Sequence, residues 1–148
     1  AVPVAMLMIR TRRRRPNRRR KAISLDITPQ IAASRMLLQG YGEGGFRVAG
    51  ERLEGSHIIF PAQACPWPVT SLAGITLESL SAVIDQSDEI DILIIGCGEE
   101  FQPIPDDLRE ALKDHGIVLE WMDTGAACRT FNVLLAEERP VAVALLAI

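Results

Sequence analysis

Continuous apolar runs in the second half of the chain predict buried strands. Residues 91–95 form one short run that stops at Gly96, and residues 117–122 form a mostly apolar run. Residues 141–148 are apolar throughout. Runs without polar alternation are typical of strands that are covered on both faces of a sheet. We therefore expect a strand at each of the three runs, with the strands at residues 91–95 and 141–148 buried.

Helical patterns lie before and between these runs. Residues 76–85 and 105–116 carry apolar side chains at helical spacing, and the second segment begins with a proline and two aspartates and ends in a glycine. Thr76 is expected to cap the first of them. A third helix is expected over residues 125–138, where Pro140 stops the pattern.

Shorter strand signals, separated by glycines, occupy the first half. Residues 36–41 and 46–49 flank a glycine-rich turn and predict a hairpin. Residues 56–60 predict a third strand, for which residues 51–55 serve as the link. Residues 62–74 contain prolines and a glycine and are expected to form a loop.

Together these elements predict a single three-layer α/β domain with a mixed central sheet over residues 23–148. Antiparallel hairpins form its first half, and its second half is strand-helix-strand-helix-strand. The strands at 91–95 and 117–122 should be parallel and joined by a right-handed crossover. The length of 148 residues suits one domain, and no internal repeat is evident.

The net charge of −3 conceals a strongly basic first segment. Nine of the 16 lysines and arginines lie within residues 10–21, and all 19 acids lie at or after Asp26, so residues 22–148 carry a charge of −12. An acidic body does not attract nucleic acid, whereas a basic tail can bind RNA or an anionic membrane. Because dense like charges are usually solvated, we favour a disordered tail over residues 1–22.

Composition narrows the class of protein further. Hydrophobic residues make up 48% of the chain, which favours a globular protein, and no apolar run reaches the ~20 residues of a membrane span. The three cysteines have no framework spacing and are interpreted as reduced thiols. These features favour a cytoplasmic location.

Three glycines match the spacing of a dinucleotide-binding motif but lack the structural context that the motif needs. Gly40, Gly42 and Gly45 match the spacing of the dinucleotide-binding motif, but that motif needs a strand before it and a helix after it. Residues 46–48 are strand-like, so the glycines predict a hairpin turn. No set of four residues has the spacing of a metal site. We expect neither a cofactor nor a metal.

The strongest candidate site lies where two parallel strands end and a helix begins. Ligands of such sheets bind beyond the carboxyl ends of the strands, and a helix start beside an arginine suits a small anion. The predicted ligand-binding residues are Gly96, Gly98, Asp123, Thr124, Arg129 and Thr130.

A structural interpretation competes with this anion site. Thr124 can cap the helix, and Asp123 can accept backbone N–H bonds or pair with Arg129. Arg129 can instead tie the helix to the turn at residues 40–45. We favour the structural interpretation, since such clusters are often structural.

Two other residues are open to interpretation. Cys128 lies in the first turn of a helix, where a thiolate is favoured. A reactive thiol also needs a base, but His57 is expected to face solvent and no base is placed beside Cys128. We therefore interpret Cys128 as a small buried hydrophobic residue. Trp67 stands in a proline-rich loop. It either plugs one end of the core or anchors a protein partner, and both alternatives are open.

Several segments together resemble one family. They are Gly40-Tyr41-Gly42-Glu43-Gly44-Gly45-Phe46-Arg47-Val48, Gly55-Ser56 with the strand up to Pro61, Leu93-Ile94-Ile95-Gly96-Cys97-Gly98, and Met122-Asp123-Thr124-Gly125-Ala126-Ala127-Cys128-Arg129-Thr130-Phe131-Asn132. The chain is similar over residues 30–148 to the domain of unknown function 498 family, whose members include the adipogenesis-associated protein and the mitochondrial complex I assembly factor 3 proteins. Cys97 departs from the pattern, which more often has threonine there.

The resemblance implies a three-layer α/β domain and, for the mitochondrial relatives, assembly factors that act through protein partners. It carries over no catalytic residue. Our first hypothesis is therefore a non-enzymatic protein-binding assembly or adaptor domain. The alternative is a small-anion-binding enzyme or sensor that uses residues 96–98 and 125–129. A third hypothesis is attachment to nucleic acid or an anionic membrane through the tail.

Overall fold

The computed structural model describes residues 35–148, which form two sheets. The basic tail, its proposed binding to nucleic acid or membranes, and the domain boundary at residue 23 lie outside the described residues. A three-stranded antiparallel sheet comprises β2 (Leu38–Gly42), β3 (Gly45–Val48) and β4 (Glu51–Glu54). A five-stranded mixed sheet, in the order β6-β5-β9-β7-β8, comprises β5 (His57–Ile59), β6 (Ala64–Pro66), β7 (Ile92–Gly96), β8 (Val118–Met122) and β9 (Val141–Leu145).

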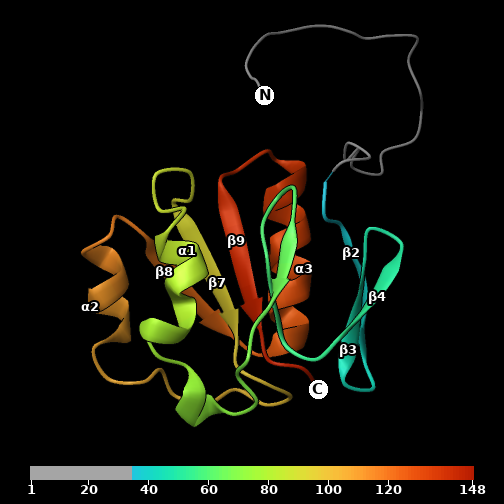
Figure 1. The fold of residues 1–148 in the computed structure, drawn as a ribbon, viewed down its shortest axis with the longest axis horizontal. Coiled ribbons are helices and arrows are strands. Elements are labelled where there is room, and N and C mark those ends of the chain that lie inside the picture. The colour runs from blue at the N-terminus through green and yellow to red at the C-terminus, as the bar shows by residue number, and fades with distance from the viewer. Residues whose placement is uncertain (1–34) are drawn as a thin grey trace, which may run out of the picture.

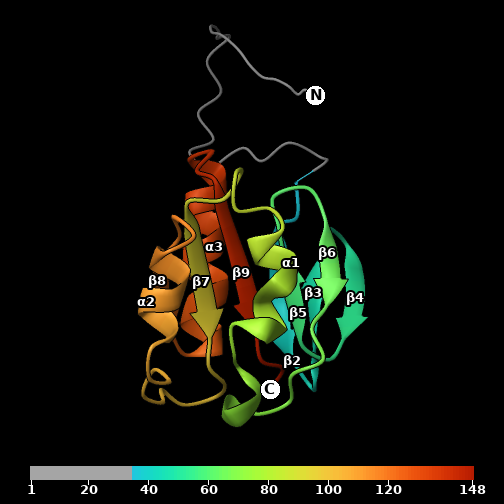
Figure 2. The ribbon, with the colours of Figure 1, turned by 60° about the vertical axis from the view of Figure 1, so that its left-hand side comes forward.

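Helices cover both faces of the five-stranded sheet (Figures 1 and 2). The longest is α3 (Thr124–Ala136), which lies on one face together with the small sheet. The shorter α1 (Ser81–Ile84) and α2 (Leu108–Lys113) lie on the other face, with the 3₁₀ turns η1 (Leu72–Gly74) and η2 (Glu78–Leu80). The predicted three-layer α/β domain with a mixed central sheet is confirmed.

The side chains of strand β7 contribute to the hydrophobic core on both faces of the sheet. Its side chains alternate between the two faces of the sheet, because successive residues of a strand point in opposite directions. Leu93 and Ile95 pack into the core beneath α1 and α2, and Ile94 packs beneath α3. All three are completely buried, which explains why this segment is a continuous apolar run.

The pairing of strands confirms the predicted parallel arrangement. β7 pairs in parallel with β8 and also with β9, and Gly96 is in register with both Met122 and Leu145. The carboxyl ends of three strands therefore meet at one edge of the sheet. β5 pairs antiparallel with β9 and β6, which makes the sheet mixed.

Several predicted boundaries are wrong. The expected link at residues 51–55 contains strand β4, and the expected loop at residues 62–74 contains β6 and η1. The expected helix at residues 76–85 is divided into η2 and a four-residue α1. The expected helix at residues 105–116 is limited to Leu108–Lys113, and the last strand ends at Leu145. Among residues 35–148, no helix has both the length and the hydropathy to cross a membrane.

Candidate functional site

Strand β7 ends in direct contact with the first turn of α3. A Cβ at position 96 would lie 2.8 Å from the Cα of Thr124 and 3.1 Å from the Cβ of Ala127. Backbone atoms cannot easily retreat from such a contact, so only glycine lets the strand approach the helix this closely. The role of Gly96 is therefore explained by packing.

Thr124 joins three segments from a fully buried position. Its hydroxyl donates to the carbonyl oxygen of Leu146 at 2.9 Å and accepts the N–H of Gly98 at 3.0 Å. Its own N–H donates to the carbonyl oxygen of Gly98 at 2.8 Å. These bonds connect the loop after β7, the start of α3 and the residue that follows β9. They also occupy the Gly98 N–H that an anion site would need.

Asp123, and not Thr124, caps α3. One carboxylate oxygen of Asp123 accepts the N–H of Ala126 at 2.8 Å, and its carbonyl oxygen accepts the N–H of Ala127 at 2.9 Å. The expectation that Thr124 caps the helix is wrong, because its hydroxyl turns inward to Leu146. A carboxylate of the protein thus occupies the place of an anion at this helix start.

The other two predicted ligand residues, Arg129 and Thr130, lie farther along α3. Arg129 is exposed, and within residues 35–148 it forms no ion pair, with Asp123 or with any other acid. A Cβ on Gly125 would lie 2.5 Å from the hydroxyl oxygen of Tyr41 and 3.5 Å from Nη1 of Arg129. Thr130 donates its hydroxyl to the sulfur of Met122 at 3.4 Å. The structure therefore gathers Gly96, Gly98, Asp123 and Thr124, and leaves Arg129 at the surface.

Cys128 is held in its protonated form. The thiol is buried, and this burial raises the pKa of Cys128 to about 12, against a smaller lowering effect of Arg129. His57 is also buried, with Nδ1 3.0 Å from the carbonyl oxygen of Gly55, so the expectation that it faces solvent is wrong. Among residues 35–148, no group of three or more histidines, cysteines and acids is placed to hold a metal ion.

Trp67 lies in the core, with only 3% of its surface exposed. Its indole N–H donates to the carbonyl oxygen of Ser79 at 2.8 Å. This geometry is that of the plug alternative, and the ring itself has almost no surface with which to touch a partner. What the ring does instead is fix the segment that carries η2.

Sequence reasoning missed the roles of Trp121 and Asn132. The indole of Trp121 donates to the carbonyl oxygen of Gln102 at 2.6 Å, and the sulfur of Cys97 accepts the N–H of Gln102 at 3.3 Å. Asn132 bonds to the main chain of Leu38. Asn132 could have been found as a single amide within the apolar part of a predicted helix. Trp121 could have been found because a buried indole needs an acceptor for its N–H.

Two adjoining cavities share the lining residues Ile75, Thr76 and Pro105, and together they are called the groove. The larger has a volume of about 540 Å³ and the smaller about 250 Å³. One wall is the segment at residues 71–77 and the other is the segment at residues 103–111. The second wall continues from the loop that follows β7, so the groove lies at the end of the molecule where the parallel strands finish.

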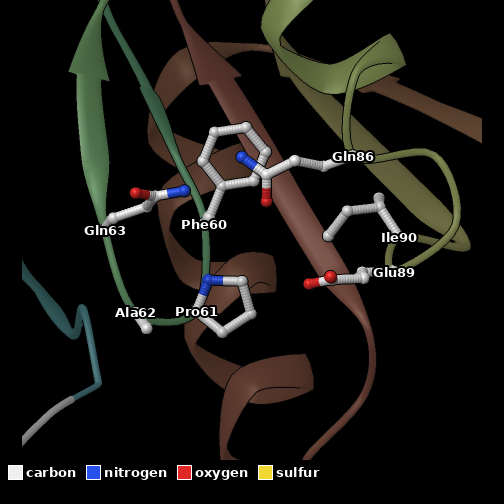
Figure 3. Close-up of a pocket in the computed structure, with 7 residues that line it drawn as sticks. All are labelled: Phe60, Pro61, Ala62, Gln63, Gln86, Glu89 and Ile90. Carbon is white, nitrogen blue, oxygen red and sulfur yellow. The ribbon is translucent and has the colours of Figure 1, made fainter. Parts of the chain in front are cut away.

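A smaller cavity of about 220 Å³ lies at the amino end of β7 (Figure 3). Its floor includes Phe60, and the side chains of Gln63, Gln86 and Glu89 lie around the opening. It contains one carboxylate and two amides but no second titratable side chain. This arrangement provides no acid–base pair and no nucleophile.

Comparison with known proteins places the chain in a family. The family model described as "Protein of unknown function (DUF498/DUF598)" matches residues 38–146. A relative in Xenopus tropicalis, named NADH dehydrogenase [ubiquinone] 1 alpha subcomplex assembly factor 3, is 33% identical over 78% of this chain. The match spans only 63% of that relative's own length.

Two solved structures are also similar. A crystal structure described as an outer membrane protein from Bartonella henselae is 43% identical, with a TM-score of 0.72, and the match covers 78% of this chain and 97% of that one. An NMR structure of a Rhodopseudomonas palustris protein is 40% identical, with a TM-score of 0.68, over 79% of this chain and 84% of that one. The chain therefore belongs to the DUF498/DUF598 family of proteins of unknown function.

Proposed function

We propose that this protein is a non-enzymatic assembly or adaptor domain that binds other proteins and assists the assembly of a respiratory membrane complex. The observation that carries the proposal is the match of 78% of the chain to a relative named as an assembly factor for the NADH dehydrogenase 1 alpha subcomplex. Because the match spans 63% of that relative, the proposal concerns the shared domain and not everything that the longer protein does.

The chemistry of the described residues supports a binding role. The loops at the carboxyl ends of the parallel strands use their polar groups to hold one another, as Thr124 does for Gly98 and Leu146. The thiol in the first turns of α3, Cys128, is kept protonated by its burial. A domain built in this way offers rigid surfaces, and rigid surfaces lower the entropy cost of protein association.

Deletion of the gene in the organism that encodes the protein tests the proposal. Loss of the protein should lower the amount of fully assembled NADH dehydrogenase on native gels, and the intact chain should restore it. A Cys128→Ala variant should restore it equally, because no thiol chemistry is involved. An unchanged amount of assembled enzyme in the deletion strain would exclude this function, and a failure of a Cys128→Ala variant that melts as a folded protein would indicate that the thiol takes part.

A small-anion-binding enzyme or sensor is the second candidate. The observation that favours it is the position of Arg129, whose guanidinium lies beside Gly125 in the first turn of α3. Phosphate or a carboxylate metabolite should then raise the melting temperature of the intact chain, and Arg129→Ala should abolish the increase. A screen of such anions without any increase counts against this candidate.

A further inference from the structure

We propose that the groove between residues 71–77 and 103–111 binds an apolar segment of a partner protein that is flanked by arginine or lysine residues. This inference rests on the proposed protein-binding function and deepens it by naming the surface and the chemistry of the partner. The volume of about 540 Å³ in its larger part lies within the range of about 300–1,000 Å³ that is typical of ligand sites.

The walls of the groove are mainly apolar. The larger part is lined by Leu72, Ala73, Ile75, Pro103 and Pro105. Ala73 and Pro103 are exposed to solvent. Leu72 and Pro105 are partly exposed. Exposed apolar surface that is gathered in one place is a mark of an interaction site.

The charge of the groove selects the partner. Asp106 and Asp107 line its smaller part, and no lysine or arginine of residues 35–148 lines either part. Residues 35–148 as a whole carry 18 acids and seven basic residues. An apolar segment with a cation at one end therefore finds a complementary surface here, while a segment with acidic flanks is repelled.

Two buried tryptophans hold the walls in place. The indole of Trp67 bonds to Ser79, whose N–H and hydroxyl in turn bond to the hydroxyl and carbonyl oxygens of Thr76 at 3.1 and 2.7 Å. On the opposite side the indole of Trp121 bonds to Gln102, next to Pro103. A groove whose two walls are fixed in this way is preformed, which reduces the entropy lost on binding. Trp67 thus serves partner binding from behind the surface.

Two synthetic peptides test the proposal on the full chain. Both carry the same apolar core of leucines and alanines, with arginines on both sides in one and glutamates in the other. Titration by NMR should show amide shifts at residues 71–77 and 103–111 for the arginine-flanked peptide. Its affinity should exceed that of the glutamate-flanked peptide by about tenfold or more.

Variants sharpen the test. Asp106→Lys combined with Asp107→Asn should remove the preference for arginine flanks, and Ala73→Lys should weaken binding of both peptides by filling the exposed wall. Asparagine is chosen at position 107 because that residue has a φ of 67°, which asparagine tolerates. As a matched control, Glu51→Lys combined with Glu54→Gln makes the same change of charge on β4 and should leave binding unchanged.

Shifts that map elsewhere, equal affinity for the two peptides, or no binding at all would overturn the groove proposal. The outcome separates this proposal from the proposed function. If gene deletion lowers the assembled complex but neither peptide binds, only the groove is wrong. If the arginine-flanked peptide binds the groove but assembly is unaffected by deletion, the surface is right and the assembly role is wrong.

Discussion

The side-chain amide of Asn132 satisfies both main-chain polar groups of Leu38, which lies 94 positions earlier in the sequence. The N–H of Leu38 donates to Oδ1 at 2.9 Å, and Nδ2 donates to the carbonyl oxygen of Leu38 at 2.7 Å. The amide of Asn132 therefore makes the hydrogen bonds that a neighbouring strand would make to the edge of β2, and it connects the small sheet to α3. The arrangement explains why an amide stands where α3 packs against β2.

Replacing this amide should loosen the small sheet. Asn132→Leu keeps the size of the side chain but leaves both polar groups of Leu38 without a partner. The free energy of unfolding in urea should fall by about 1–3 kcal/mol. The neighbouring Val133→Ala, at a position with 56% of its surface exposed, is the control and should have a small effect. Equal effects of the two variants would contradict the role given to Asn132.

The hydroxyl of Thr124 should matter more than its methyl group. Thr124→Val preserves the shape of the side chain but leaves the N–H of Gly98 and the carbonyl oxygen of Leu146 unsatisfied. We expect a loss of about 2–4 kcal/mol in the free energy of unfolding. Thr124→Ser keeps the hydroxyl and should cost less. If the serine variant were the less stable of the two, packing and not hydrogen bonding would be the role of Thr124.

Gly96 should not tolerate even one added methyl group. In Gly96→Ala the new carbon would lie 2.8 Å from the Cα of Thr124, so β7 and α3 would have to separate. A decrease of several degrees in melting temperature is expected, because separating them disturbs a close-packed core. Gly40→Ala is the matched control, since nothing lies within 4 Å of the position of its added carbon. A similar decrease in melting temperature in both variants would show that the close contact between Gly96 and Thr124 is not the reason why glycine is needed at position 96.

Burial of Cys128 should make stability depend on alkaline pH. The pKa of this thiol rises from 9.0 to about 12 in the folded chain, so the unfolded chain releases the proton first as pH increases. The stabilisation is complete below pH 9 and is lost between pH 9 and about 12, by at most about 1.4 kcal/mol for each pH unit.

A Cys128→Ala variant has no such proton to lose. The difference in unfolding free energy between wild type and variant should therefore narrow as the pH rises from about 8 to about 11. Urea titrations under reducing conditions measure this difference directly. A difference that stays constant over the range would mean that the thiol is not shielded from water.

The fold of the second half could be predicted because its strands are unmistakable. Residues 92–96 and 141–145 are buried on both faces, so their sequences are continuous apolar runs. β4 gave no such signal, since its sequence Glu51-Arg52-Leu53-Glu54 belongs to an exposed edge. β6 is three residues long and ends in proline, which is typical of a loop as well as of an edge strand.

The candidate site could be predicted in place but not in detail. The meeting of β7, β8 and α3 followed from parallel strands, whose carboxyl ends share an edge. Asp123 and Thr124 are both good cap residues, so only the direction of the Thr124 hydroxyl decides between them. The role of Trp67 depends on a hydrogen bond from a proline-rich loop to Ser79 in the 3₁₀ turn η2, which no periodicity predicts.

The gene-deletion experiment, repeated with variants of the groove, tests directly whether the domain works by binding a partner there. The deletion strain receives either wild type, Asp106→Lys with Asp107→Asn, or Glu51→Lys with Glu54→Gln, and thermal melts confirm that each protein is folded. We predict that wild type and the β4 variant restore the assembled complex, whereas the groove variant restores much less. Full restoration by all three proteins would contradict the claim that this domain works by binding a partner at the groove.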